Sequence, residues 1–88
     1  MKEKNLERQL KALANRRRLA ILKHLKDNRE APVARIAEAI NLSFKSTSKH
    51  LGILAALEII EKEQRSLQMF YRLVDVNPPA VKYVISLL

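Results

Sequence analysis

The strongest constraint on how this chain can fold is a pair of helical apolar patterns separated by only about three residues. Apolar residues recur at offsets of three, four and seven over residues 33–40, and a second amphipathic pattern covers residues 44–57. Asn41 can end the first helix in a left-handed conformation, and Ser43 can cap the second. A connection this short forces the two helices to cross steeply, which predicts a helix-turn-helix over residues 33–57.

Two further helices are predicted before this unit. Leucines at helical spacing indicate an amphipathic helix over residues 5–14. Asn15 is a good N-cap for a second helix, which we expect over residues 16–26. The polar stretch 27–30 then reads as a connection without regular structure.

After Glu58 the apolar period changes from that of a helix to two, the period of a strand. This alternation predicts a β-hairpin over residues 59–74 with its tip at Arg65-Ser66. The Asn-Pro-Pro sequence at 77–79 ends the pattern, and a short helix is expected over 80–88. The predicted fold is mostly α with a small β-hairpin wing, a winged helix-turn-helix in a single domain spanning residues 1–88.

The charge of the chain indicates an anionic partner. Lysine and arginine total 17 against 9 acidic residues, which gives a net charge of +8 and an isoelectric point near 10.2. Nucleic acid is the first partner to consider, although basic residues can also serve solubility alone. The absence of cysteine excludes disulfides, zinc–thiolate sites and thiol redox switches. No apolar run is long enough to span a membrane, so we expect no membrane partner and a cytoplasmic location.

One face of the helix starting at Phe44 has the chemistry needed to contact duplex DNA. Lys45, Ser48, Lys49 and Gly52 lie at offsets 0, 3, 4 and 7 and therefore share this face. Lysine and serine can donate to phosphates and base edges, and glycine allows close approach. A merely solvated face would explain the lysines but not the glycine, which is costly inside a helix. The predicted base-reading residues are Phe44, Lys45, Ser46, Ser48 and Lys49.

A second predicted DNA contact lies at the start of the second helix. Arg16, Arg17 and Arg18 oppose the helix macrodipole there, which makes them candidates for a phosphate-binding site together with free backbone N–H groups. Arg65 at the hairpin tip is a candidate for a minor-groove or flanking phosphate contact. For each arginine the alternative is a side chain that simply extends into water.

Neither catalysis nor a metal site is indicated. His24 and His50 are isolated in the sequence, with no second ligand at metal-binding spacing. No nucleophile–base pair, glycine-rich phosphate loop or pair of carboxylates is recognisable, so no enzyme activity, metal or cofactor is expected.

The last predicted helix is apolar nearly all the way round, since valines, isoleucine and leucines occupy most of residues 81–88. One core face cannot cover such a helix in a domain this small, so a partner chain is the natural place to bury the remainder. The sequence therefore predicts a two-fold dimer.

Three segments match motifs that occur together in one protein family. Residues 10–25 read LKALANRRRLAILKHL, which resembles LADPTRLRIL with Arg18 at the matching arginine. Residues 33–60 resemble the family's helix-turn-helix, with its S-x-H-L motif at 48–51, and residues 69–75 read MFYRLVD, similar to its second wing strand. Over residues 6–75 the chain thus resembles the ArsR family of bacterial winged-helix repressors.

This resemblance implies a homodimer joined by the first and last helices, which binds a palindromic operator and represses transcription. The expected interface residues are Leu6, Leu10 and Leu13 in the first helix and Val81, Val84, Ile85 and Leu88 in the last. Many family members sense metals through ligands in the third or last helix, and neither helix carries a ligand set here. Glu58 and the tip Gln64-Arg65-Ser66 also lack glycines that are usual in the family.

Two other functions compete with a sequence-specific repressor. The winged helix could be a protein-interaction or assembly module whose basic face meets an acidic partner. It could also be a non-specific nucleic-acid binder, whose affinity would depend steeply on salt without a preferred sequence.

Overall fold

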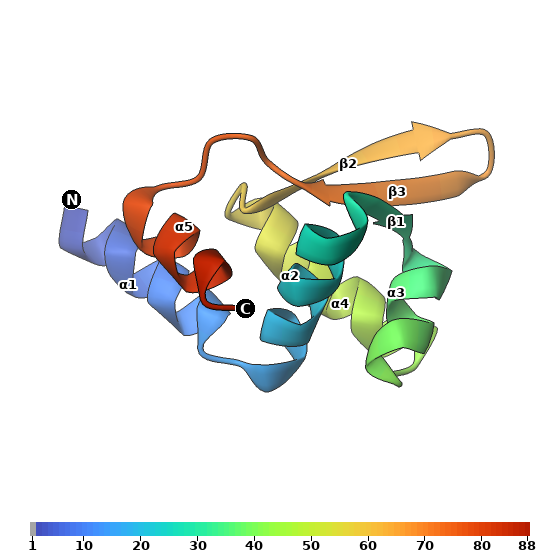
Figure 1. Ribbon diagram of the computed structural model, residues 1–88, viewed down its shortest axis with the longest axis horizontal. Coiled ribbons are helices and arrows are strands. Elements are labelled where there is room, and N and C mark those ends of the chain that lie inside the picture. The colour runs from blue at the N-terminus through green and yellow to red at the C-terminus, as the bar shows by residue number, and fades with distance from the viewer. Residues whose placement is uncertain (1) are drawn as a thin grey trace.

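A computed structural model describes residues 2–88 of the chain and has a winged helix-turn-helix fold (Figure 1). The helices are α1 (Lys2–Leu13), α2 (Arg16–Asn28), α3 (Val33–Ile40), α4 (Phe44–Ala56) and α5 (Pro79–Ser86). The strands are β1 (Glu30–Pro32), β2 (Ile60–Arg65) and β3 (Gln68–Leu73). The predicted fold class, mostly α with a β-hairpin wing, is confirmed.

The capping signals in the sequence place the helix boundaries. The Asn15 side chain accepts a hydrogen bond from the Arg18 N–H at the start of α2, and the Ser43 hydroxyl accepts one from the Ser46 N–H at the start of α4. Asn41 ends α3 in the left-handed region, with φ 54° and ψ 53°. The turn between α3 and α4 is therefore built as the sequence predicts.

The segment before α3 differs from the prediction. Helix α2 continues to Asn28, and Arg29 ends it with φ 60°. Glu30, expected in an irregular polar connection, begins strand β1, which pairs antiparallel with β3. Three residues are too few to show a period, and this strand forms only because β3 offers an edge to pair with.

The three strands form one antiparallel sheet in the order β1-β3-β2. In the hairpin Ile60 pairs with Leu73 and Arg65 with Gln68, so the two turn residues are Ser66 and Leu67. The predicted tip at Arg65-Ser66 is thus one residue too early, because Arg65 is still paired in β2.

The core lies between the helices and the sheet. Its fully buried side chains include Ile21, Leu22 and Leu25 of α2, Ile36 of α3, Leu51 and Leu54 of α4, and Ile59 and Ile60 at the start of the wing. Burial of these side chains contributes most of the stability and fixes which side of α4 faces outward.

Helices α1 and α5 pack together at the end of the molecule away from the wing tip (Figure 1). Leu13 and Val81 lie inside the core, with only 4% and 0% of their surfaces exposed. The prediction that these two residues contact a partner chain is therefore wrong, because both side chains are buried in the core of their own chain. None of the helices described over residues 2–88 is long and apolar enough to cross a membrane.

Candidate nucleic-acid interface

Helix α4 turns its lysines outward and its apolar side toward the core. Thr47, Leu51 and Leu54 are fully buried, while Lys45 and Lys49 are exposed and Phe44 keeps 60% of its surface in contact with solvent. Within residues 2–88 neither lysine lies within ion-pair distance of a carboxylate. The outward face of α4 therefore presents two unpaired positive charges on its first two turns.

The remaining residues of this face leave room for an approaching surface. Ser46 and Ser48 are half-buried beside the lysines, and Gly52 is exposed. A Cβ atom built on Gly52 would meet no atom within 4 Å. The glycine is thus not required by packing within the chain, which fits a role in close approach from outside.

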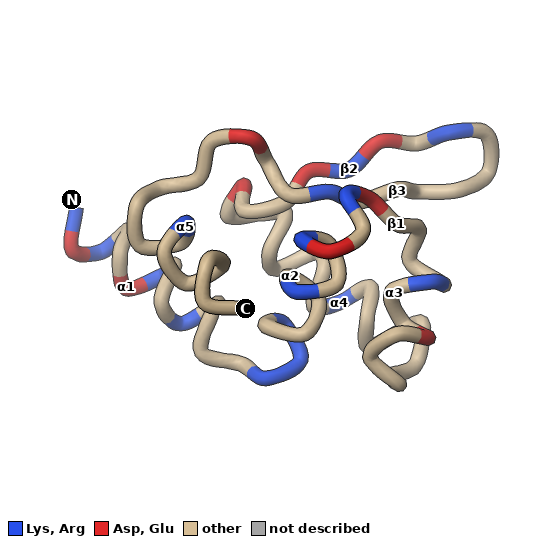
Figure 2. Tube along the Cα trace, viewed as in Figure 1, with Lys and Arg blue, Asp and Glu red and all other residues tan. Residues whose placement is uncertain are grey.

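The start of α2 forms an unbroken basic segment (Figure 2). Arg16 is exposed, and Arg17 reaches from α2 to donate to the Ile40 carbonyl at 3.5 Å, so its guanidinium lies beside the end of α3. The structure thus brings Arg17 to the end of α3 and leaves Arg16 exposed next to it at the start of α2.

Arg18 is used within the protein. Its Nε donates to the Ala12 carbonyl at 2.5 Å and its Nη2 to the Lys11 carbonyl at 3.4 Å, which satisfies two carbonyls at the end of α1. Its Nη1 lies 3.2 Å from Nδ1 of His50 on α4. Arg18 therefore connects α1, α2 and α4, and it is not the free phosphate-binding residue that the sequence predicts.

His50 is the acceptor of this contact. A guanidinium can only donate, so Nδ1 of His50 must accept and the imidazole is neutral. Burial lowers the pKa of His50, and the nearby charges of Arg18, Lys49 and Arg17 lower it further. His50 is a half-buried packing residue of α4.

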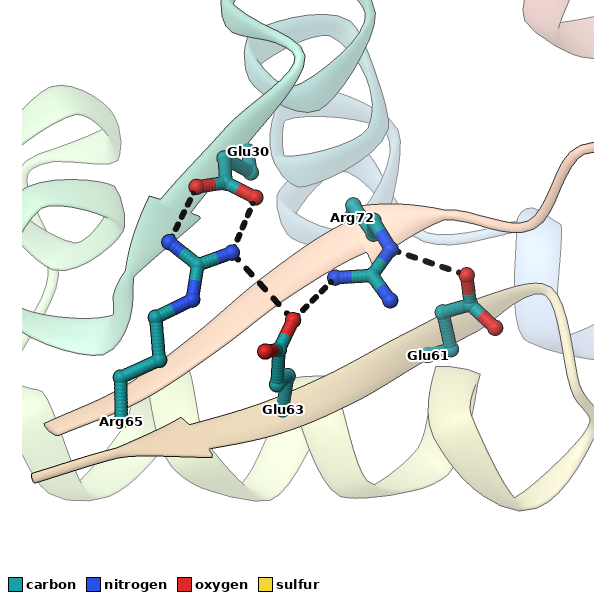
Figure 3. A network of polar contacts seen from close by, with 5 residues as sticks. All are labelled: Glu30, Glu61, Glu63, Arg65 and Arg72. Atoms are coloured by element: carbon teal, nitrogen blue, oxygen red, sulfur yellow. Dashed lines mark hydrogen bonds and ion pairs between the residues drawn. The ribbon is translucent and has the colours of Figure 1, made fainter.

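The arginines of the wing are held in a network of ion pairs (Figure 3). Arg65 binds both oxygens of Glu30 at 2.6 and 2.7 Å and also contacts Glu63 at 3.3 Å. Arg72 binds Glu61 at 2.9 Å and Glu63 at 3.0 Å. The network joins all three strands.

Hydrogen bonds from the arginines lower the pKa values of two carboxyl groups in this network. Bonding to Arg65 lowers the pKa of Glu30, and bonding to Arg65 and Arg72 lowers the pKa of Glu63. The Arg65 guanidinium also lies over the Phe70 ring, 4.5 Å from its centroid.

Arg65 is therefore not the free cation predicted for the wing tip. Binding a phosphate would require it to give up a bidentate pair with Glu30, a partner that the sequence did not reveal because β1 was not predicted. The turn beyond it carries Leu67, which is 97% exposed. The wing tip thus presents an apolar side chain in place of a free positive charge.

No group of three or more metal-ligating side chains lies close together in the part of the chain that the structure describes. The His24 ring lies within hydrogen-bond distance of the Asn28 side chain, one turn further along α2, at 3.3 Å.

Comparison with known proteins identifies the class. The family model described as winged helix-turn-helix DNA-binding matches residues 15–61, which is more than half of the chain. The chain belongs to this family. No curated protein sequence is similar enough to the chain to count as a relative.

Solved structures place the chain more closely. Reduced HlyU from Vibrio cholerae is 33% identical, with a TM-score of 0.82 over 99% of this chain and 87% of that protein. The homodimeric winged helix-turn-helix DNA-binding domain of Mb0332 from Mycobacterium bovis, a possible ArsR-family transcriptional regulator, is 30% identical, with a TM-score of 0.81 over 96% of this chain and 74% of that one.

A third relative is the antimony-specific transcriptional repressor AntR, which is 29% identical with a TM-score of 0.77 over 90% of this chain and 68% of that one. The similarity to ArsR-type regulators is thereby confirmed. The protein is a DNA-binding transcription regulator and not an enzyme.

Proposed function

We propose that this protein is a homodimeric transcriptional repressor that recognises a palindromic operator through the outward face of α4 and acts in the cytoplasm. The observation that carries the proposal is the pair of exposed, unpaired lysines, Lys45 and Lys49, on the half of the helix that meets base edges in other helix-turn-helix proteins. Lysine can bind guanine edges or phosphates there.

The other residues of the interface have supporting roles. Ser48 shares the lysine face and can donate or accept at a base edge, and Phe44 is exposed enough to contact a thymine methyl group. Ser46, in the first turn of α4, is assigned a phosphate contact. Arg16 and Arg17 supply phosphate contacts from α2, which would fix the register of α4 in the major groove.

A dimer is supported by the apolar surface that α1 and α5 leave uncovered. Leu6 and Leu10 of α1 are 43% and 47% exposed and line a shallow apolar groove of about 400 Å³. Tyr83 and Leu87 of α5 are 67% and 66% exposed. A second copy would remove this surface from water, and the homodimeric state of the Mb0332 domain supports the same arrangement.

The proposed interface consists of Leu6, Leu10, Val84, Ile85 and Leu88, together with Tyr83 and Leu87. Val84, Ile85 and Leu88 are half-buried and pack partly on their own core, so they would line the edge of the interface. A two-fold dimer would place two α4 helices about 34 Å apart, which matches successive major grooves on one side of a duplex. Sedimentation of a monomer at micromolar concentration would contradict the dimer.

Repression is supported by AntR, a transcriptional repressor of similar fold and sequence. The test is selection of binding sites from a random duplex library at near-physiological salt, followed by footprinting of the enriched sequence. A palindromic motif with two protected half-sites is expected. Enrichment of no sequence would contradict operator recognition and favour a non-specific binder or an assembly module.

A further inference from the structure

A second concave surface lies between α1 and the C-terminal half of α4. It is a shallow groove of about 370 Å³ whose floor is formed by Ala12, Ile53, Ala56 and Leu57. Its rim carries three positive charges, from Arg8, Lys11 and Arg18. No carboxylate lines it; Glu58 lines an adjoining hollow with Arg8 but does not reach this one.

The rim charges are available to a ligand. Arg8 has no carboxylate within ion-pair distance over residues 2–88. Lys11 has only Glu7, at 3.8 Å and with both side chains largely exposed, a pairing that contributes little. Arg18 is already engaged in three contacts within the protein, so it adds positive charge to the rim without offering a free guanidinium.

An apolar floor with an exclusively basic rim is complementary to a molecule with a hydrocarbon body and an acidic head. The floor removes apolar surface from water, and the rim supplies charge-assisted hydrogen bonds. A neutral or cationic amphiphile of the same length would gain only the first contribution.

The groove stays open in the proposed dimer. Residues two apart on a helix point to nearly opposite sides, and Arg8 stands two residues from both Leu6 and Leu10. Lys11 lines both the leucine groove and this one, so a partner chain that covers the leucines reaches the Lys11 edge and leaves the Arg8 side open.

The groove is also in contact with the recognition helix. Ile53 on its floor is one turn beyond Lys49, and Ala56 two turns beyond, on the exposed side of α4. Arg18 on the rim is hydrogen-bonded both to the end of α1 and to His50 of α4. A bound anion would compete for Arg18 and place negative charge close to the lysine face.

We propose that this groove binds an amphipathic carboxylate, a small molecule with an apolar chain and an anionic head. Its binding lowers the affinity of the protein for DNA. The regulatory part of this inference rests on the proposed function, since it requires an operator to be released.

The test uses decanoate as the probe, below its micelle concentration, with decanol and decyltrimethylammonium as matched neutral and cationic amphiphiles. Binding is measured directly by calorimetry and by amide chemical shifts, and separately by anisotropy of labelled operator DNA. Decanoate is expected to shift amides of α1 and α4 and to reduce DNA affinity, and the other two amphiphiles to bind more weakly. Equal binding of all three, or shifts confined to the α1–α5 surface, would overturn the proposal.

Two variants locate the site. Arg8→Glu reverses a rim charge and is expected to weaken decanoate binding by about fivefold or more, while Lys82→Glu makes the same reversal on α5 and should leave it unchanged. Ala56→Glu places a carboxylate on the groove floor and should also abolish binding, provided that circular dichroism shows native helix content. Decanoate binding that survives both Arg8→Glu and Ala56→Glu would overturn the site.

Operator binding and ligand binding in the groove are tested independently. Loss of operator binding in the absence of any ligand would contradict the proposed function, and the calorimetric titration would still decide whether the groove takes the carboxylate. Normal operator binding that decanoate does not alter would overturn the regulatory role alone.

Discussion

The helix-turn-helix and the wing both carry basic side chains, but the two regions use them differently. On α4, Lys45 and Lys49 extend into solvent and, over residues 2–88, have no acidic partner. On the wing, Arg65 and Arg72 are each bound to two carboxylates (Figure 3). Two regions that both carry basic residues therefore offer an anion very different surfaces, because the availability of a positive charge depends on the acidic partners that the fold brings close.

The two regions also differ in how they form their turns. The helix-turn-helix places Asn41 in the left-handed region, which asparagine tolerates. The wing begins at Glu58 with φ 58° and turns at Ser66 with φ 56°, positions where glycine is preferred. The helix-turn-helix is thus built from residues suited to their conformations, while the wing keeps two strained residues beside its network of ion pairs.

The largest expected difference between the regions concerns the same substitution made in each. Leu51→Ala removes a fully buried side chain from beneath α4 and should lower the free energy of unfolding by about 2–5 kcal/mol. Leu67→Ala at the exposed wing tip should change it by less than about 0.5 kcal/mol. Urea unfolding measures both; similar losses would mean that the wing tip is packed against something.

The second difference concerns DNA affinity. Lys49→Ala should weaken operator binding by about 1–3 kcal/mol if the lysine reads a base, and should relax the preference at that position. Arg65→Ala should change the DNA affinity by less than about twofold, because the Arg65 guanidinium is already paired with Glu30 and contributes little to DNA binding.

Anisotropy titrations at fixed salt test this pair of variants. Equal losses would show that the wing network opens when DNA binds, and the distinction between the two regions would then hold only for the free protein.

A smaller effect is expected at the strained turn of the wing. Glu58→Gly relieves a positive φ but gives the unfolded chain more freedom, so the net stabilisation should be about 0.5–1 kcal/mol. Asn41→Gly is the matched control in the helix-turn-helix and should change the free energy of unfolding little. A destabilised Glu58→Gly variant would mean that the Glu58 side chain makes a contribution larger than the strain.

The smallest expected effects concern how the free energy of unfolding depends on pH through groups in each of the two regions. The pKa of His50 is lowered in the folded state, so the unfolded chain binds the proton first and stability falls as the pH drops from the ordinary histidine value of 6.5 toward the lowered pKa. The lowered pKa values of Glu30 and Glu63 mean that their stabilisation is complete above the ordinary value of 4.5 and is lost as the pH falls through the folded values.

Urea unfolding at successively lower pH should therefore show two steps. His50→Gln should remove the step at higher pH, and Glu63→Gln should reduce the step at lower pH. A single step, or a higher-pH step that persists without His50, would contradict the assignment.

Local signals in the sequence were sufficient for most of the fold. Capping residues such as Asn15 and Ser43, and the change of period after Glu58, are short-range features whose physical effect does not depend on the rest of the chain. Strand β1 could not be predicted in this way, because it exists only through pairing with β3, forty residues further along.

The candidate site was predicted less completely. The outward face of α4 follows from helical periodicity alone, so Lys45 and Lys49 could be placed in advance. The contacts of four other residues could not be predicted, because they depend on tertiary neighbours. Arg18 meets the end of α1, Arg65 meets Glu30 on β1, and Leu13 and Val81 pack into the core. Periodicity gives the direction of a side chain but not the group it meets.

The order of the sheet has a consequence for solubility. Strand β2 is one of the two edge strands of the sheet, and unpaired backbone groups on an edge strand can pair with a strand of another molecule. Along this edge Glu61, Lys62, Glu63 and Arg65 place charges at four of six positions, and pairing two such edges would strip these charges of water. The charged residues that form the salt bridges of the hairpin thus also disfavour edge-to-edge pairing between molecules.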